Sequence, residues 1–204
     1  MAKKILHTIL GILLVYSAVA FAIKASIGVL PVDAAITSIA LLTGMKVGTF
    51  SMLFHGSFFL GQIAMEKKNF RKTELLQILY VVFGGSVLNF FLYTILKNVS
   101  FSFYPLRVFV CVAAFFVSAF GCTLVLETKL MRTPMEGCIQ MIADRLGTTM
   151  GKLRQKIDIV LVLICVAITL VFGVEWTLRE GTIIAALLFG PMMDFWKNMF
   201  SKRK

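Results

Sequence analysis

Polar residues are rare in the apolar runs of this sequence, and six polar residues in these runs or in the segments that join them are candidates for chemistry. A charged side chain at the centre of a bilayer costs roughly 2.5–3.5 kcal/mol on insertion scales, so a polar residue there needs a structural or functional reason. Histidine changes its charge near neutral pH, and a histidine that faces an acid is a candidate for proton coupling. The sequence therefore predicts a substrate-binding or ion-coupling site from His55, Asp158, Asp33, Glu136, Asn89 and Asp194.

Each of these residues also has a structural interpretation. His55 can donate a hydrogen bond to a neighbouring helix, and Asp158 can pair with the basic residues that precede it. Asp194 lies near the basic C-terminus and can be a solvated charge at a helix end. Asp33 and Glu136 can be first-turn acids that offset the positive end of a helix dipole.

Motifs of catalysis and of metal binding are absent from the sequence. There is no G-x-S-x-G, H-E-x-x-H, P-loop or dinucleotide pattern. The four cysteines show no C-x-x-C or zinc spacing, and two histidines are too few to complete a metal cluster. We therefore predict that the protein is not an enzyme and holds no catalytic residue, metal or cofactor. An intramembrane acid–base enzyme built on His55 and Asp158 is the remaining catalytic alternative.

The elements that must position the candidate residues are membrane helices. The chain has 204 residues, 59% of them hydrophobic, and its mean hydropathy of +0.90 lies far above that of a soluble domain. About 20 residues cross a hydrocarbon core of about 30 Å. The connections are too short to fold alone, so we predict one all-α integral membrane domain over residues 1–204. Its six predicted spans are 5–23, 47–65, 75–96, 106–126, 157–174 and 181–198.

The net charge of +11 follows the positive-inside rule and does not indicate nucleic-acid binding. With the N-terminus inside, 16 of the 21 basic residues fall in cytoplasmic segments. This distribution predicts a multi-pass protein of the plasma membrane with both termini in the cytoplasm. The five basic residues outside are Lys24, Lys46, Lys97, Arg107 and Arg179.

The sequence repeats itself after 103 residues. Residues 31–48, PVDAAITSIALLTGMKVG, align without gaps on residues 134–151, PMEGCIQMIADRLGTTMG, with six identities in 18 positions. Farther on, G-S-V-L-N-F at 85–90 corresponds to G-P-M-M-D-F at 190–195. Each half holds three spans, an odd number, so the second half must enter the membrane from the opposite face. We therefore predict two inverted three-helix repeats, residues 1–96 and 106–198.

The N-terminal segment also resembles a cleaved signal peptide. Lys3 and Lys4 precede an apolar run that ends in the small residues 18–20. We expect this segment to be retained, because cleavage would leave five spans and break the symmetry of the repeats.

Each repeat includes a short helix that cannot span the bilayer. Pro31 and Pro134 suit the first helical position, where the missing N–H of proline costs nothing. An acid follows two residues later in each copy, and Gly44 and Gly147 end the helices. A helix of ~12 residues is only ~18 Å long. Each short helix must therefore lie at the interface or enter the membrane and return.

Three motifs carry a family resemblance: G-V-L-P-V-D at 28–33, T-G-M-K-V-G-T at 43–49 and E-G-T-I-I-A-A-L-L-F-G-P at 180–191. In these motifs, and over nearly its whole length, the chain resembles the YczE/YyaS/YitT-like family of small bacterial membrane proteins. Val32 departs from that family, which often has an aromatic residue after the proline. The resemblance implies a polytopic plasma-membrane protein and a transport role, and it carries over no substrate and no catalytic residue.

The repeat matches His55 with Asp158 and Asn89 with Asp194, at positions that would line a cavity between the halves. We therefore predict a transporter or channel for a small solute or ion, with the lipid bilayer as its surroundings. The alternative is an accessory protein that does not transport and that stabilises or regulates a partner; its interior should be apolar throughout. The acids of the two short helices disfavour an anion and favour a cation, a proton-coupled solute or a neutral molecule.

Overall fold

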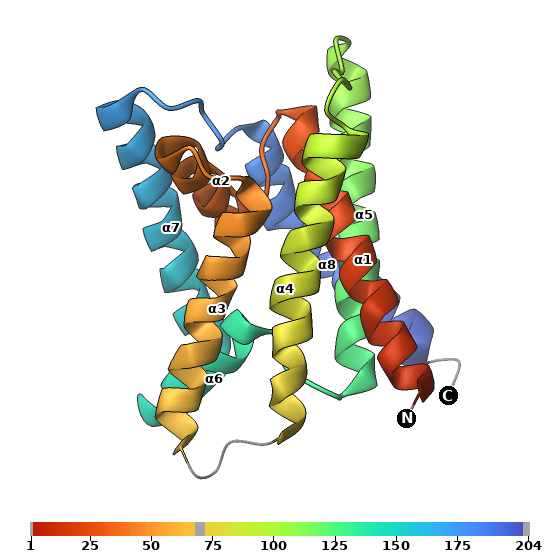
Figure 1. The fold of residues 1–204 in the computed structure, drawn as a ribbon, viewed down its shortest axis with the longest axis vertical. Coiled ribbons are helices and arrows are strands. Elements are labelled where there is room, and N and C mark those ends of the chain that lie inside the picture. Colours follow the sequence, from red (N-terminus) through yellow and green to blue (C-terminus); the bar gives the residue numbers. More distant parts are fainter. Residues whose placement is uncertain (1, 68–71, 202–204) are drawn as a thin grey trace.

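Six long helices stand side by side in the computed structural model, which describes residues 2–67 and 72–201 (Figure 1). All regular structure in these residues is helical. A 3-10 turn (Lys72–Leu75) precedes the third long helix, and a π-helical segment (Phe91–Ile95) continues it. The long helices are α1 (Ala2–Ala25), α3 (Val47–Glu66), α4 (Leu76–Phe90), α5 (Tyr104–Thr128), α7 (Met150–Phe172) and α8 (Glu180–Ser201).

Two short helices lie at opposite ends of the bundle (Figure 1). The helix α2 (Pro31–Thr43) has 13 residues and α6 (Pro134–Arg145) has 12, and both begin at the predicted prolines. Gly44 has φ +69° and Gly147 has φ +61°, in the left-handed region that glycine adopts without strain. The end of the bundle near α6 also carries both chain termini.

The helices have the composition of a membrane protein. Four of them, α1, α4 with its flanking turns, α5 and α7, are long and apolar enough to cross a membrane. A fifth crossing results if α2 and α3, which are bent by 119° at their junction, form one broken span. By themselves α3 and α8, with 20 and 22 residues, are not among these four, and they contain polar residues such as His55 and Asp194. The predicted all-α fold is confirmed for the described residues, and length and hydropathy support four or five of the six predicted spans.

The most extensive contact between helices in the bundle is that of α1 with α5, the first long helix of each half. A Cβ added at Gly11 would lie 2.8 Å from the carbonyl oxygen of Gly121, and a Cβ at Gly121 would lie 2.8 Å from that of Gly11. The two backbones therefore meet without side chains between them, which is how membrane helices gain close van der Waals packing.

Each short helix packs against a long helix of the other half. The helix α2 packs on α7, and α6 packs on α3. Within each half, the first and third long helices also pack together: α4 on α1 in the first half, and α8 on α5 in the second. One pair breaks this correspondence, because α3 and α4 are closely packed while α7 and α8 make almost no contact.

Candidate functional site in the groove between α7 and α8

The gap between α7 and α8 is a groove of about 670 Å³. Its walls are apolar: Ile159, Val162 and Leu163 line it from α7, and Ala185 and Phe189 from α8. The volume lies within the range of about 300–1,000 Å³ that is usual for small-molecule sites. The polar residues of the groove are Glu136, Arg154, Gln155 and Asp158.

The first turns of both short helices reach this groove. Pro31 lines it from the start of α2 and Glu136 from the start of α6, although the two helices come from opposite ends of the bundle (Figure 1). The N-terminal end of a helix carries a positive partial charge, so acids in the first turn are favourable there. Asp33 and Glu136 are these acids. Two helix starts therefore approach one region of the protein from both sides, and the carboxylate of Glu136 lines it.

Arg154 is the basic residue at the centre of this region. Its Nε lies 3.1 Å from Oδ1 of Asp158, one turn later on α7. Both members of the Arg154–Asp158 ion pair are about a third exposed. The charged groups that line the groove are two carboxylates, those of Glu136 and Asp158, and one guanidinium, that of Arg154. The lining is therefore negatively charged when both acids are ionised.

His55 lies among aromatic rings and does not line the groove. Its ring centroid is 5.9 Å from that of Tyr80 and 5.6 Å from that of Phe54, in edge-to-face contacts. Its buried Nδ1 has no hydrogen-bond partner among the described residues, and neither has the buried hydroxyl of Tyr16, which packs on Tyr80. A buried polar atom without a partner costs free energy. His55 therefore does not share the groove with Asp158.

Asn89 and Asp194 lie away from the groove lining. Asn89 Oδ1 accepts a hydrogen bond from the backbone N–H of Gly48 at 2.9 Å, and its Nδ2 donates to Thr49 Oγ1 at 3.0 Å. This side chain therefore fastens α4 to α3, which is its structural interpretation. Asp194 is exposed on α8. Of the six predicted site residues, the groove itself contains Glu136 and Asp158.

A buried polar network near the end that carries the termini was missed in the sequence. Gln62 and Gln77 are fully buried and exchange two hydrogen bonds, of 3.0 and 3.1 Å. Gln77 also donates to Glu74 at 2.6 Å, and Glu74 pairs with Arg132 at 3.2 Å. Arg132 lies 3.1 Å from Glu66 as well. The available signal was the same as for His55, since both glutamines interrupt apolar runs.

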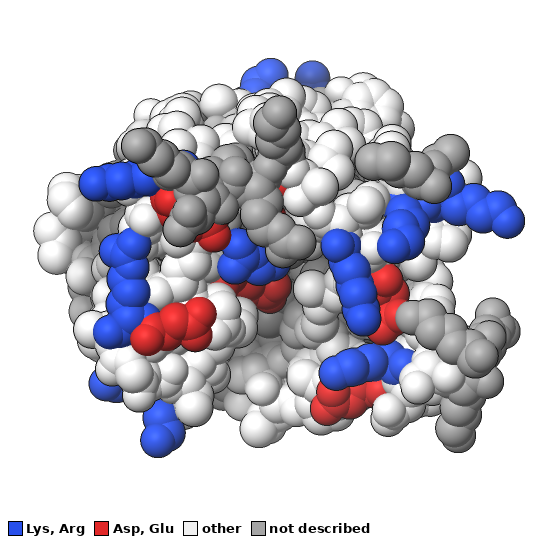
Figure 2. All heavy atoms as spheres, turned by 90° about the horizontal axis from the view of Figure 1, so that it is seen from below, with Lys and Arg blue, Asp and Glu red and all other residues white. Residues whose placement is uncertain are grey.

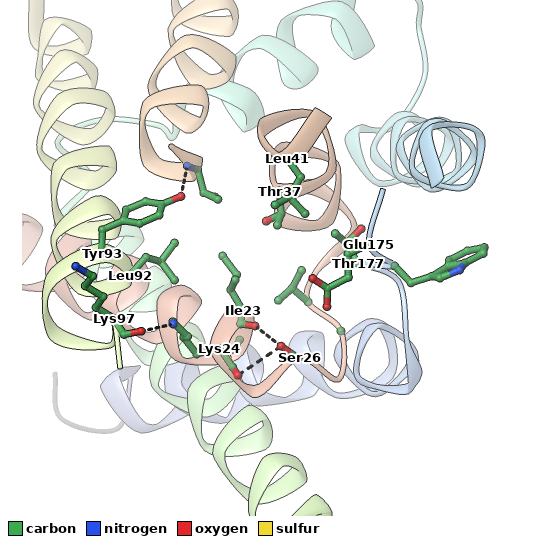
Figure 3. Close-up of a pocket in the computed structure, with 15 residues that line it drawn as sticks. Ile23, Lys24, Ser26, Thr37, Leu41, Leu92, Tyr93, Lys97, Glu175 and Thr177 are labelled. Carbon is green, nitrogen blue, oxygen red and sulfur yellow. Dashed lines mark hydrogen bonds between the residues drawn. The ribbon is translucent and has the colours of Figure 1, made fainter. Parts of the chain in front are cut away.

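A second cavity, of about 320 Å³, opens near α2 and the end of α4 (Figure 3). Thr37 lines it from α2, and Tyr93 and Lys97 line it from the α4 side. The Nζ of Lys24 donates to the carbonyl oxygen of Lys97 at 3.3 Å, which holds one of the two lysines at its edge. Glu175 lines the same cavity. It therefore combines both charge signs at the end of the bundle opposite the termini.

Apolar long helices, short helices at opposite ends and a charged groove between helices define a polytopic helical membrane protein. Residues 2–198 match the family of unknown function DUF6198, and the chain belongs to that family. No curated protein and no solved structure matches the chain significantly. The resemblance to the YczE/YyaS/YitT-like family stays a prediction.

Proposed function

We propose that the protein is a small transporter or channel of the plasma membrane, with a solute site between two inverted repeats. The observation that carries the proposal is the groove between α7 and α8 of the second repeat, where charged residues meet the start of α6 and, from the first repeat, the start of α2 at Pro31. Irregular backbone and short helices at membrane depth persist where they line a cavity. An accessory protein has no need of such a charged cavity, whereas a transporter requires one.

The packing of the helices supports the inverted repeats. The contact of α2 with α7 corresponds to that of α6 with α3, and the contact of α1 with α4 corresponds to that of α5 with α8. The connections agree with this correspondence. Glu74, just before α4, binds the backbone N–H of Arg132 in the segment that leads into α6. Arg179, just before α8, binds the carbonyl oxygen of Ser26 in the segment that leads into α2.

The one difference between the halves suggests how the protein moves. Gly48 of α3 lies against the backbone of Gly85 in α4, so closely that a Cβ on either would overlap its neighbour. Gly151 of α7 and Gly190 of α8 occupy the same places in the second repeat, and no atom lies within 4 Å of a Cβ added at either. Inverted repeats allow the two halves to exchange their conformations. In the exchanged state α7 and α8 would close and α3 and α4 would open.

Cross-linking tests this exchange. Gln155 of α7 corresponds to Met52 of α3, whose side chain packs on Gly85. In a protein freed of its four cysteines, we expect Gln155→Cys and Gly190→Cys to form a disulfide on oxidation in membranes. A disulfide requires the two Cβ atoms to be about 3.8 Å apart, and no atom approaches Gly190 so closely in the present state. To measure the bond, the chain is cut by a protease between residues 155 and 190. The two fragments then migrate together on a non-reducing gel only where the disulfide has formed.

The control pair for this experiment is Thr49→Cys with Asn89→Cys, whose side chains touch in the closed half. This pair should cross-link readily. If it does so while the Gln155–Gly190 pair never forms a bond, the groove does not close, and the accessory-protein alternative replaces transport.

The proposed orientation places both termini in the cytoplasm. Figure 2 shows the end that carries the termini, where Lys and Arg side chains are spread around the face with acids among them. In the same cysteine-free protein, Thr73→Cys and Ser201→Cys should react with a membrane-impermeant maleimide only in opened cells. Ser100→Cys should react in intact cells. All three side chains are exposed. Labelling of Thr73→Cys in intact cells would reverse the orientation.

A further inference from the structure

We propose that the groove binds amphipathic organic cations, molecules that carry a positive centre on an apolar body. This inference rests on the proposed transport function and adds its substrate class. It follows from three features of the groove: its charge, its apolar walls and its opening between α7 and α8 at the side of the bundle.

The charge of the groove selects a cation. Glu136 and Asp158 line it. Arg154 neutralises one carboxylate through its ion pair with Asp158. Negative charge remains, and a bound anion would meet it without compensation. A cation near Glu136 and Asp158 would restore neutrality.

The walls select an apolar body. Ile159 and Leu163 on α7 are 54% and 61% exposed, and Phe189 and Met193 on α8 face them across the groove. Only 22% of the most apolar window of α7 is buried inside the protein, so this side of the helix is open to the surroundings. A hydrated inorganic ion gains nothing from such walls, whereas burial of apolar surface stabilises a bound organic molecule.

The position of the groove indicates the route of entry. Because α7 and α8 make almost no contact, the groove is open between them along the side of the bundle. An amphipathic cation dissolved in the bilayer would reach Asp158 through this opening without first returning to water.

Binding of radiolabelled tetraphenylphosphonium to the purified protein in detergent tests the proposal, with tetraphenylborate as an anion of the same shape. We expect saturable binding of the phosphonium and none of the borate. Asp158→Asn and Glu136→Gln should each weaken phosphonium binding about tenfold, the change that corresponds to loss of one charged contact. Asp144→Asn is the matched control, because Asp144 is exposed at the far end of the same short helix as Glu136.

A variant that fails to fold is recognised by its gel-filtration profile. In that case Asp158→Glu is tested in its place; it keeps the negative charge and should therefore keep phosphonium binding. Equal binding of phosphonium and borate, or full affinity in both neutral variants, overturns the proposal. If the Gln155–Gly190 bond forms but phosphonium does not bind, the substrate class is wrong and the transport function stands. If neither is observed, the proposed function itself fails.

Discussion

Replacing Gly48 by alanine should destabilise the protein by about 1–3 kcal/mol, the usual cost of overpacking a close contact. The added methyl group would overlap the carbonyl oxygen of Gly85, which is backbone and cannot rotate away. The helices α3 and α4 must therefore separate. This separation also stretches the 2.9 Å hydrogen bond from Gly48 to Asn89. The midpoint of thermal unfolding in detergent measures the loss.

Gly151→Ala is the matched control, because it makes the same change at the corresponding position of the second repeat. No atom lies within 4 Å of the new methyl group, and alanine is a better helix former than glycine. Its unfolding midpoint should equal or slightly exceed that of the unmodified protein. Equal losses in both variants would contradict the structural difference between the two halves.

Glu74→Ala should destabilise the protein by about 1–3 kcal/mol, because it removes a buried carboxylate that accepts hydrogen bonds from Gln77 and from the partly exposed Arg132. Glu74 is 3% exposed and accepts hydrogen bonds from Gln77 at 2.6 Å and from Arg132 at 3.2 Å. With the carboxylate gone, the amide nitrogen of Gln77 keeps only its bond to Gln62 Oε1. Unfolding by denaturant, followed by tryptophan fluorescence, measures the change.

Glu175→Ala provides the comparison, since Glu175 also pairs with an arginine. Its Oε1 lies 3.7 Å from Arg179 and its side chain is 68% exposed. Exposed ion pairs contribute about 0–1 kcal/mol, so this variant should unfold almost as the unmodified protein does. A loss as small for Glu74→Ala as for Glu175→Ala would show that the buried network does not stabilise the fold.

The short helices were the part of the fold that the sequence predicted best. Proline and glycine act through backbone geometry, so Pro31 and Pro134 mark helix starts, and Gly44 and Gly147 helix ends, in any surroundings. The faces of the long helices were harder to predict. Lipid and protein interior are both apolar, and a membrane helix therefore has little amphipathic pattern to show which side is buried.

The candidate site was predicted only in part, because the sequence does not show which side of each long helix faces the protein interior. Glu136 and Asp158 line one groove, but His55 points among aromatic rings instead. The repeat fixes which positions correspond, and it does not fix the distance between helices. That α7 and α8 stand apart while α3 and α4 touch depends on tertiary packing alone. The reciprocal bonds of Gln62 and Gln77 depend in the same way on how two helices are shifted along each other.

Because each short helix packs on a long helix of the other half, the order of folding is constrained. The buried side of α2 is covered by α7, which is synthesised long after it. Until α7 inserts, the first half of the chain has a helix without its cover, and α6 finds its own cover on α3 in a half that is already made. The first half alone therefore cannot complete its own packing, because the cover of α2 belongs to the second half.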